Sequence, residues 1–215
     1  MKLERMDEFF ASRVESYDGH MLREVGGCAE GYELMAKRIA ELAPGRLLDL
    51  GCGTGLELDF ILKLCPDIEV TGIDMTEAML AKLRKKHPDA KLRLICGDYF
   101  EVPFGAGYGA AVSFQTLHHF TRERKLGLYK RLYDALAPGG VYIECDYMCD
   151  TDEQERGFFE ELERLKREQG IDGAQLHFDT PITVAGQIGL LRSAGFSKVE
   201  KIFREENTVM LRAEK

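Results

Sequence analysis

The sequence predicts an α/β fold: a doubly wound sheet, mostly parallel, that ends in a C-terminal antiparallel hairpin. From residue 46 onward, short apolar runs alternate with amphipathic stretches, which is the order of parallel strands joined by covering helices. Three glycines at alternate positions follow the first run, where a strand would turn into a helix. Two β-like runs close the chain, and the polar stretch 204–206 between them is short enough for antiparallel pairing.

Each element has its own sequence evidence. Strands are expected at 46–50, 69–73, 92–96, 109–114 and 141–145, the last after the turn Pro-Gly-Gly at 138–140. Helices are expected at 56–64, at 76–86 with Thr76 as its cap, and at 121–136, where leucines recur every fourth residue. A helix over 181–194 then precedes the hairpin strands at 196–199 and 207–211.

The chain of 215 residues suits a single domain, with two regions outside the strand–helix alternation. Residues 1–43 are expected to form an N-terminal helical cap. Residues 148–182 are expected to form a helical insertion that contains one highly charged helix at 152–169. Because both lie outside the sheet, they are expected to cover its carboxyl edge as a substrate lid.

Composition excludes several classes of protein. The formal net charge is −8, from 29 Lys and Arg against 37 Asp and Glu, without a basic block, which argues against a nucleic-acid partner. No apolar run reaches the ~18 residues that a membrane span needs, so no membrane partner is expected. The first five residues lack the apolar core of a signal peptide, and we expect a cytoplasmic protein.

The six cysteines are scattered and form no Cys-x-x-Cys pair. Cys145 and Cys149 with His177 make the best metal set that the sequence offers, and the pattern favours no metal site. Most of the cysteines lie in apolar runs such as 92–96, which ends in Cys96, so they are expected to behave as small buried hydrophobes.

The most informative segment is Leu-Leu-Asp-Leu-Gly-Cys-Gly-Thr-Gly at 47–55. Positions without a Cβ let the backbone approach a ligand closely, and the helix that follows presents unpaired N–H groups. Acids follow the next two strands: Asp74, which could hold the hydroxyls of a ribose or cap a helix, and Asp98, which alone would be a turn residue.

Together these pieces resemble the class I S-adenosylmethionine-dependent methyltransferases, which have a Rossmann-like fold. The match covers about 46–150 well and 185–213 in outline, with Ala194-Gly195-Phe196 before the closing hairpin. It implies S-adenosyl-L-methionine as the cofactor, methyl transfer as the activity and a set of cofactor-binding residues. That set is Tyr17, Asp49, Gly51, Cys52, Gly53, Gly55, Asp74, Met75, Asp98 and Tyr99.

The resemblance also implies a role for each part of the set. The three glycines face the methionine part of the cofactor, and Asp49 lies near its amino group. Asp74 holds the ribose and Met75 packs against adenine, whereas Asp98 accepts a hydrogen bond from the adenine amine with Tyr99 beside the ring. Tyr17, in Ser-Tyr-Asp at 16–18, closes over the cofactor.

Two other functions compete with this one. A dehydrogenase shares the strand, the glycines and Asp74, but its pattern Gly-x-Gly-x-x-Gly requires glycine at position 56, where the chain has Leu56. A regulatory protein or pseudoenzyme that binds the cofactor without turnover would have the same sequence pattern, and only turnover with an acceptor would separate it.

The chemistry is expected after the fourth strand, at 115–120, because ligands of open α/β sheets bind beyond the carboxyl ends of the strands. Gln115 has an amide that can contact the methionine end of the cofactor. His118 and His119 are candidates for the proton acceptor, or for a structural pair packed under the next helix. The segment lacks Asn-Pro-Pro-Tyr and an acid cluster, which favours a small-molecule acceptor and disfavours magnesium-assisted chemistry.

Overall fold

A computed structural model describes residues 2–172 and 175–215, so Met1 of the predicted cap and residues 173 and 174 of the predicted insertion lie outside the described residues. The fold is α/β, as predicted, with a seven-stranded sheet in the order β4-β3-β2-β5-β6-β9-β8. The first five strands of that order are parallel, and β9 pairs antiparallel with both β6 and β8. The strands are β2 (Arg46–Leu50), β3 (Glu69–Asp74), β4 (Leu92–Cys96), β5 (Tyr108–Phe114), β6 (Leu136–Tyr147), β8 (Lys198–Glu205) and β9 (Thr208–Glu214).

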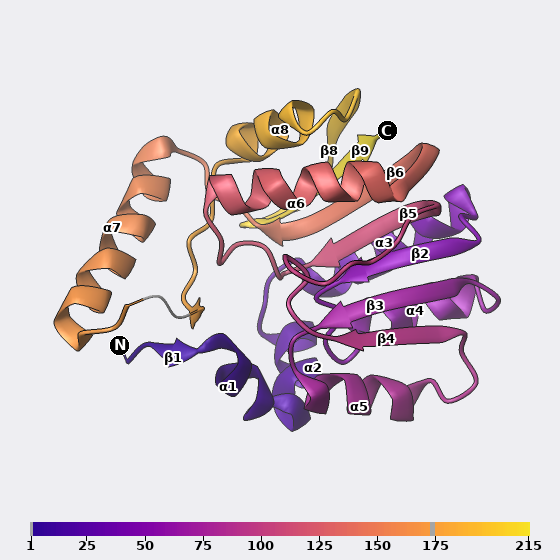
Figure 1. The fold of residues 1–215 in the computed structure, drawn as a ribbon, viewed down its shortest axis with the longest axis horizontal. Helices are drawn as coiled ribbons and strands as arrows, with labels where there is room; N and C mark the ends of the chain where they lie inside the picture. The colour runs from indigo at the N-terminus through magenta and orange to yellow at the C-terminus, as the bar shows by residue number, and fades with distance from the viewer. Residues whose placement is uncertain (1, 173–174) are drawn as a thin grey trace.

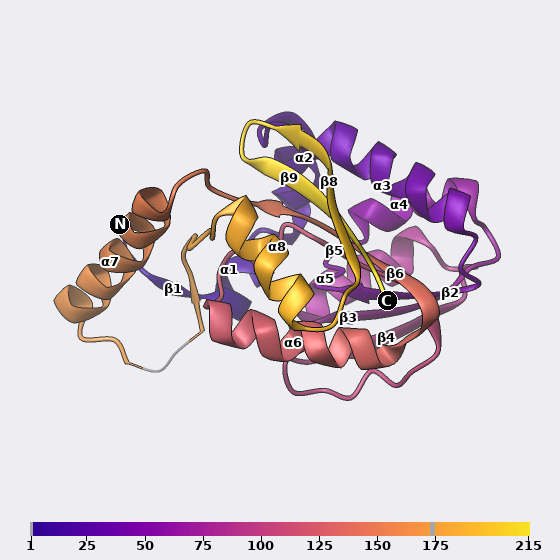
Figure 2. The same cartoon turned by 90° about the horizontal axis from the view of Figure 1, so that it is seen from above.

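Helices cover both faces of this sheet (Figures 1 and 2). On one face lie α3 (Cys28–Leu42), α4 (Leu56–Leu64) and α5 (Glu77–Lys86), whose apolar side chains share one buried cluster with the sheet. On the other face lie α6 (Arg122–Ala135) and α8 (Val184–Ser193), which belong to a second cluster. Residues 47–50 of β2 are buried throughout, because a central parallel strand is covered on both sides.

The order of the strands creates one switch point. The chain runs from β2 outward to β3 and β4, then returns to β5 on the other side of β2. The loops after β2 and β5 therefore separate at their carboxyl ends, where open α/β sheets form a crevice for ligands. The glycine loop and the segment 115–120 flank this crevice.

Some predicted boundaries are wrong. β6 begins at Leu136 rather than 141, because Leu136 already pairs with Tyr108 before the Pro-Gly-Gly segment. α8 begins at Val184 rather than 181, because the Thr183 side chain caps it by accepting from the Gly186 N–H. The hairpin strands extend to Glu205 and Glu214, beyond the predicted ends, with the turn at 206–207.

The predicted Thr76 cap is also different in detail. Thr76 occupies the cap position of α5, but its hydroxyl makes no capping hydrogen bond. The Asp74 carboxylate accepts from the Thr76 N–H instead, at 2.8 Å. This hydrogen bond fixes the turn between β3 and α5.

The N-terminal cap and the insertion meet beside the sheet. Within the cap lie β1 (Glu4–Arg5), α1 (Met6–Ala11), α2 (Val14–Arg23) and α3, which packs on the sheet. The insertion contains α7 (Asp152–Gln169) and β7 (Leu176–His177). The sequence did not indicate the antiparallel pairing of β1 with β7, which ties the two regions together. α7 stands beside the body of the molecule next to the N-terminus in both views (Figures 1 and 2).

An ion pair between α6 and α7 helps to fasten the insertion to the body. Arg122, at the start of α6, makes two hydrogen bonds of 2.6 Å to Glu155 of α7. Glu155 also accepts from the Thr183 N–H at 2.9 Å. This contact fixes the base of α7 against α6 and α8.

The cysteines follow the prediction at four positions, where they are buried: Cys28, Cys52, Cys145 and Cys149. Cys96 is exposed, contrary to the prediction, because β4 is the edge strand and Cys96 is its last residue. In the part of the chain that the structure describes, no helix has the length and apolarity to span a bilayer.

Candidate cofactor and acceptor sites

The three glycines of the loop after β2 all have positive φ, at 70° for Gly51, 47° for Gly53 and 74° for Gly55. A Cβ on Gly51 would collide with the Thr116 side chain, and one on Gly55 would collide with Leu83 of α5. A Cβ on Gly53 would meet no atom closer than 3.9 Å, so open space lies beside this residue. Gly51 and Gly55 are thus required for packing, and Gly53 leaves room beside the loop.

Asp74, the last residue of β3, holds the loop in place. One carboxylate oxygen accepts from the Gly53 N–H at 2.9 Å, and the other accepts from the Thr76 N–H at 2.8 Å. Because each carboxylate oxygen has two acceptor positions, both oxygens can still accept a hydrogen bond from a ligand. Asp74 does not cap α5, because its partner Thr76 N–H precedes the first turn of the helix, and its free acceptor positions leave the ligand-binding role as a prediction.

Asp98 lies two residues beyond the end of β4, and its carboxylate has three partners, one of which is the Arg124 guanidinium at 3.5 Å. One oxygen accepts from the Phe100 N–H at 2.9 Å, and the other accepts from the Gln175 amide at 2.6 Å. Gln175 belongs to the insertion, immediately before β7. Tyr99 beside it is buried, and its hydroxyl donates to the Thr116 carbonyl at 3.1 Å. The insertion therefore reaches the acid proposed for adenine.

A pocket at the switch point collects most of the predicted cofactor residues. Those that line it are Tyr17, Gly51, Gly53, Asp74, Met75, Asp98, Tyr99 and Gln115. Cys52 and Gly55 do not line it: Cys52 is buried with its sulfur beside Gly72, and Gly55 faces Leu83. Met6, Phe10 and Gln175 close the pocket from the cap and the insertion.

Asp49 does not line the pocket either, and its setting is unusual. It is fully buried in β2, and neither carboxylate oxygen has a hydrogen-bond partner among the described residues. Glu57 of α4 is buried nearby, and one of its oxygens also lacks a partner. Burial raises the pKa of Asp49, and burial together with the charge of Asp49 raises the pKa of Glu57. Two buried carboxyl groups of this kind are stabilised either by binding protons or by a cationic group close to them.

This acid fits the cofactor that the glycine loop indicates. The methionine end of S-adenosylmethionine carries an ammonium group, and an unpartnered buried carboxylate is a suitable partner for a cation. The open space beside Gly53 lies on the loop next to it. The residues present therefore suit S-adenosylmethionine.

A larger cavity of about 860 Å³ adjoins this pocket. It is bounded by the cap, the loop after β5 and the end of the insertion, and the two cavities share Phe10, Tyr17 and Gln115. Its wall includes the aromatic rings of Phe9, Tyr147 and His177. The shared residues make the junction of the two cavities the place where a bound cofactor and a second molecule would meet.

Gln115 occupies this junction in a strained backbone conformation, with φ of 49°. Its amide nitrogen donates to the Thr208 hydroxyl at 3.1 Å, and Thr208 in turn donates to the Gly26 carbonyl at 2.7 Å. The chain of hydrogen bonds joins the loop after β5 to the closing hairpin and the cap. Gln115 thus fixes the edge of the junction.

His118 points into the larger cavity and is fixed from behind by Asp146. Its Nδ1 lies 2.6 Å from Asp146 Oδ1, and Asp146 also accepts from the N–H groups of Leu117 and Tyr147. Its Nε2 lies 3.4 Å from an oxygen of Asp179. Burial opposes the charge of His118, but the two acids outweigh it and raise its pKa to about 9.

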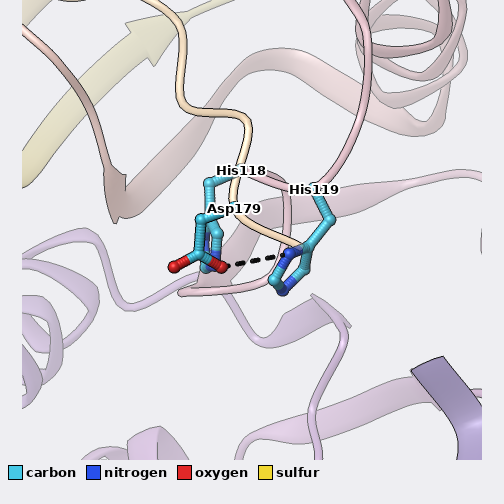
Figure 3. A group of neighbouring side chains, drawn as sticks. All are labelled: His118, His119 and Asp179. Atoms are coloured by element: carbon cyan, nitrogen blue, oxygen red, sulfur yellow. Dashed lines mark ion pairs between the residues drawn. The ribbon is translucent and has the colours of Figure 1, made fainter. Parts of the chain in front are cut away.

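His119 lies against the same acid. Its Nδ1 is 3.4 Å from the Asp179 oxygen and 3.1 Å from the Phe178 carbonyl oxygen, and the two imidazoles face Asp179 (Figure 3). Burial and the charge of His118 lower the pKa of His119 well below its usual range. The pKa of the Asp179 carboxyl is lowered against its burial, chiefly by its hydrogen bond to His118. His177, whose ring stacks on Phe9 at 3.4 Å, has a pKa lowered by burial to about 4.

Two residues of this site were missed from the sequence. Asp146 follows the predicted fifth strand, and the rule that singled out Asp74 and Asp98, an acid after a strand, could have found it. Asp179 lies in an irregular segment before α8, and no sequence pattern marks it. The cysteine set does not assemble: among the described residues, the one group able to hold a metal ion is His118, His119 and Asp179.

Comparison with known proteins agrees with this geometry. Residues 47–140 match the family model described as a methyltransferase domain. A carboxy-S-adenosyl-L-methionine synthase of Helicobacter pylori (strain G27) is 30% identical over 183 residues, covering 79% of this chain and 75% of that protein. The protein of the same name from Campylobacter curvus (strain 525.92) is 26% identical over 218 residues, covering 95% of this chain and 93% of that protein.

Solved structures show the same fold. Human N-acetylserotonin methyltransferase, in complex with S-adenosylmethionine, superposes with a TM-score of 0.68 at 19% identity over 97% of this chain. The chain spans 56% of that enzyme. DhpI, in complex with S-adenosylhomocysteine, gives a TM-score of 0.70 at 16% identity over 96% of this chain and 93% of its own.

The fold, the glycine loop and these matches define a class. The chain belongs to the class I S-adenosylmethionine-dependent methyltransferases. It is an enzyme of S-adenosylmethionine-dependent methyl transfer, with S-adenosyl-L-methionine as its cofactor.

Proposed function

We propose that this enzyme transfers the methyl group of S-adenosylmethionine to a small molecule bound in the 860 Å³ cavity. The observation that carries the proposal is the junction of the two cavities at Phe10, Tyr17 and Gln115. A cofactor held by the glycine loop would direct its methyl group toward that junction. Methyl transfer is an in-line displacement at an already activated carbon, and alignment alone is worth about 7–11 kcal/mol.

The cofactor-binding residues are proposed as follows. Asp49 balances the ammonium group of the methionine end, and Gly51 and Gly53 let this end approach the backbone. Asp74 binds the ribose hydroxyls through the acceptor positions that its two backbone partners leave free. Asp98 binds the adenine amine, between Met75 and Tyr99.

His118 and His119 are proposed to act at the reacting atom of the acceptor and to promote the loss of its proton. Both border the larger cavity, next to Gln115. His118 is held by Asp146 at 2.6 Å, the arrangement that orients an imidazole toward a reacting group. The acceptor would then be a hydroxyl, an amine or a carboxylic acid that must lose a proton as the methyl group arrives.

The lid is proposed to be the cap, 1–43, with the insertion, 148–182, within one domain of residues 1–215. Phe9 and Phe10 of α1 and His177 of β7 contact one another across the two regions, with Phe9 and His177 stacked at 3.4 Å. The β1–β7 pairing supports a joint movement of the two. Such a lid would exclude water from the junction during transfer.

Calorimetry with S-adenosylmethionine, S-adenosylhomocysteine and NAD tests the cofactor assignment. We expect the first two to bind and NAD not to bind, because the glycine pattern lacks the third glycine of the dehydrogenases at position 56. Binding of NAD with no response to the other two would contradict the proposal. A screen of phenols, amines and carboxylic acids, followed by detection of S-adenosylhomocysteine, then tests turnover and separates an enzyme from a binding protein.

The relatives favour a second candidate. Two proteins that match nearly the whole or most of this chain are named carboxy-S-adenosyl-L-methionine synthase. In such a reaction S-adenosylmethionine would itself be the molecule that is modified. Mass spectrometry of the nucleoside product distinguishes the two: S-adenosylhomocysteine indicates methyl transfer, and S-adenosylmethionine carrying an added carboxyl group indicates the second candidate.

A further inference from the structure

We propose that His118, His119 and Asp179 form a binding site for a divalent transition-metal ion, which holds the acceptor beside the methyl group. This inference rests on the proposed function and gives the two histidines a specific way of promoting proton loss. One ligand atom from each residue lies within 4.8 Å of the others, at the wall of the larger cavity (Figure 3).

The first argument is the orientation of His118. Asp146 accepts from two backbone N–H groups, and its Oδ1 lies 2.6 Å from His118 Nδ1, which we assign as a third donor to this carboxylate. His118 Nε2 then faces Asp179, whose ionised carboxylate can only accept. Between a nitrogen lone pair and a carboxylate, a positive centre is required, either a proton or a metal ion. An imidazole oriented from behind by a carboxylate is also the usual arrangement of histidine ligands to metals.

The second argument is distance. His118 Nε2 and His119 Nδ1 each lie 3.4 Å from the same Asp179 oxygen. A charge-assisted N–H···O bond is shorter, about 2.7–2.9 Å. Two ligands of a tetrahedral ion with bonds of about 2.0–2.1 Å are about 3.3–3.4 Å apart. The spacing therefore fits an ion better than a direct hydrogen bond.

Metal binding also sets the tautomer of His119. Without an ion, the Phe178 carbonyl oxygen, 3.1 Å from Nδ1, accepts a hydrogen bond from that nitrogen. Binding of an ion at Nδ1 therefore requires the proton of His119 to move to Nε2. Two imidazoles with a carboxylate suit zinc, iron, cobalt or manganese rather than calcium, which prefers oxygen ligands alone.

An open coordination position is available on the cavity side. The His119 side chain is 2% exposed, whereas 45% of the Asp179 side chain is exposed. An acceptor hydroxyl could bind the ion from that side and lose its proton to water, because a bound metal lowers the pKa of a hydroxyl. The acceptor oxygen then forms a bond to the methyl carbon, the carbon–sulfur bond breaks with its electron pair going to sulfur, and S-adenosylhomocysteine leaves. The metal does not change its oxidation state.

The test is a metal titration of the whole protein after dialysis against a chelator, with Co²⁺ followed by its visible spectrum and Zn²⁺ by competition. One equivalent is expected to bind. Asp179→Asn should abolish this binding, and Asp146→Asn, which removes the carboxylate behind His118, should weaken it about 10–100-fold. The control is His87→Gln, which breaks a histidine–carboxylate pair of 2.6 Å elsewhere and should leave metal binding unchanged.

Each variant is also titrated with S-adenosylhomocysteine and melted, so that a folding defect is separated from a lost ligand. The inference is overturned if the wild type binds neither ion more tightly than Asp179→Asn does. It is also overturned if the chelated enzyme turns over an identified acceptor at the full rate. In that case the histidines would act directly, and the proposed methyl transfer would stand. Failure to bind S-adenosylhomocysteine would instead contradict the cofactor assignment.

Discussion

The cofactor pocket and the acceptor cavity share a wall but are built in different ways. The pocket is formed mainly by loops that follow the neighbouring parallel strands β2, β3, β4 and β5, and residues of the cap and the insertion close it. The cavity takes His118 and His119 from the loop after β5, Tyr147 from the end of β6 and Asp179 from the insertion. The position of the cofactor pocket therefore depends mainly on the sheet, whereas the acceptor cavity depends on how segments distant in sequence pack together.

The largest effect is expected from a substitution that changes the acceptor cavity and leaves the cofactor pocket unchanged. His119→Asn should slow turnover by about 10²–10⁴-fold, because the reacting atom loses the group that promotes departure of its proton. Affinity for S-adenosylhomocysteine should remain, since the residue does not line the cofactor pocket. Steady-state kinetics with an identified acceptor and calorimetry check the two parts. Full turnover by the double variant of His118 and His119 would leave alignment as the only source of catalysis.

The next effect changes only the pocket. Asp98→Ala and Asp74→Ala should each weaken cofactor binding about ten- to a hundred-fold, because each removes a hydrogen bond to a charged group. Asp74→Ala should also lower stability by about 1 kcal/mol, since it removes the carboxylate that accepts from the Gly53 and Thr76 N–H groups. Calorimetry and denaturant unfolding measure the two quantities, with Asp67→Ala, an almost fully exposed acid, as the control. Unchanged affinity in Asp74→Ala would make its assignment to the ribose untenable.

A smaller effect concerns stability against pH in the cofactor-free protein. Burial raises the pKa of Asp49 and Glu57, so the folded protein holds protons that the unfolded chain releases. Stability therefore falls as pH rises from the ordinary carboxyl range through the raised pKa. Asp49→Asn should remove this loss and raise the melting temperature at pH 8 by about 2–4 °C.

Asp49→Asn should also weaken S-adenosylmethionine binding, because the ammonium group of the cofactor loses its anionic partner. Glu57→Gln gives an independent measure of the pH effect, and Asp67→Asn serves as the exposed control. A melting temperature that depends on pH equally in wild type and Asp49→Asn would show that folding does not raise the pKa of Asp49.

The smallest effect tests the contact between the two regions. Gln175 of the insertion donates to Asp98 at 2.6 Å, where the adenine amine is proposed to bind. Gln175→Ala should strengthen cofactor binding about two- to tenfold. The reason is that the Gln175 amide no longer competes with the adenine amine for the Asp98 carboxylate. Calorimetry with S-adenosylhomocysteine measures it. Weaker binding would mean that Gln175 belongs to the adenine site rather than competing with it.

The sequence by itself determined the sheet and the position of the cofactor loops. Apolar runs separated by amphipathic stretches specify parallel strands, and glycines or acids directly after a strand must lie at its carboxyl edge. The helices at 56–64 and 152–169 were predicted with the bounds that α4 and α7 have. These features are local, because each follows from residues a few positions apart along the chain.

Only the tertiary structure decided the rest. Asp179 is 60 residues from His119 in the sequence, and no periodicity links them, so their 3.4 Å contact depends on how the insertion docks. The β1–β7 pairing and the Gln175–Asp98 contact likewise join segments more than 70 residues apart. The burial of Asp49 without a partner depends on packing against both faces of β2. Such contacts form only when whole segments pack against each other, and the free energy of that packing depends on residues far apart in the sequence.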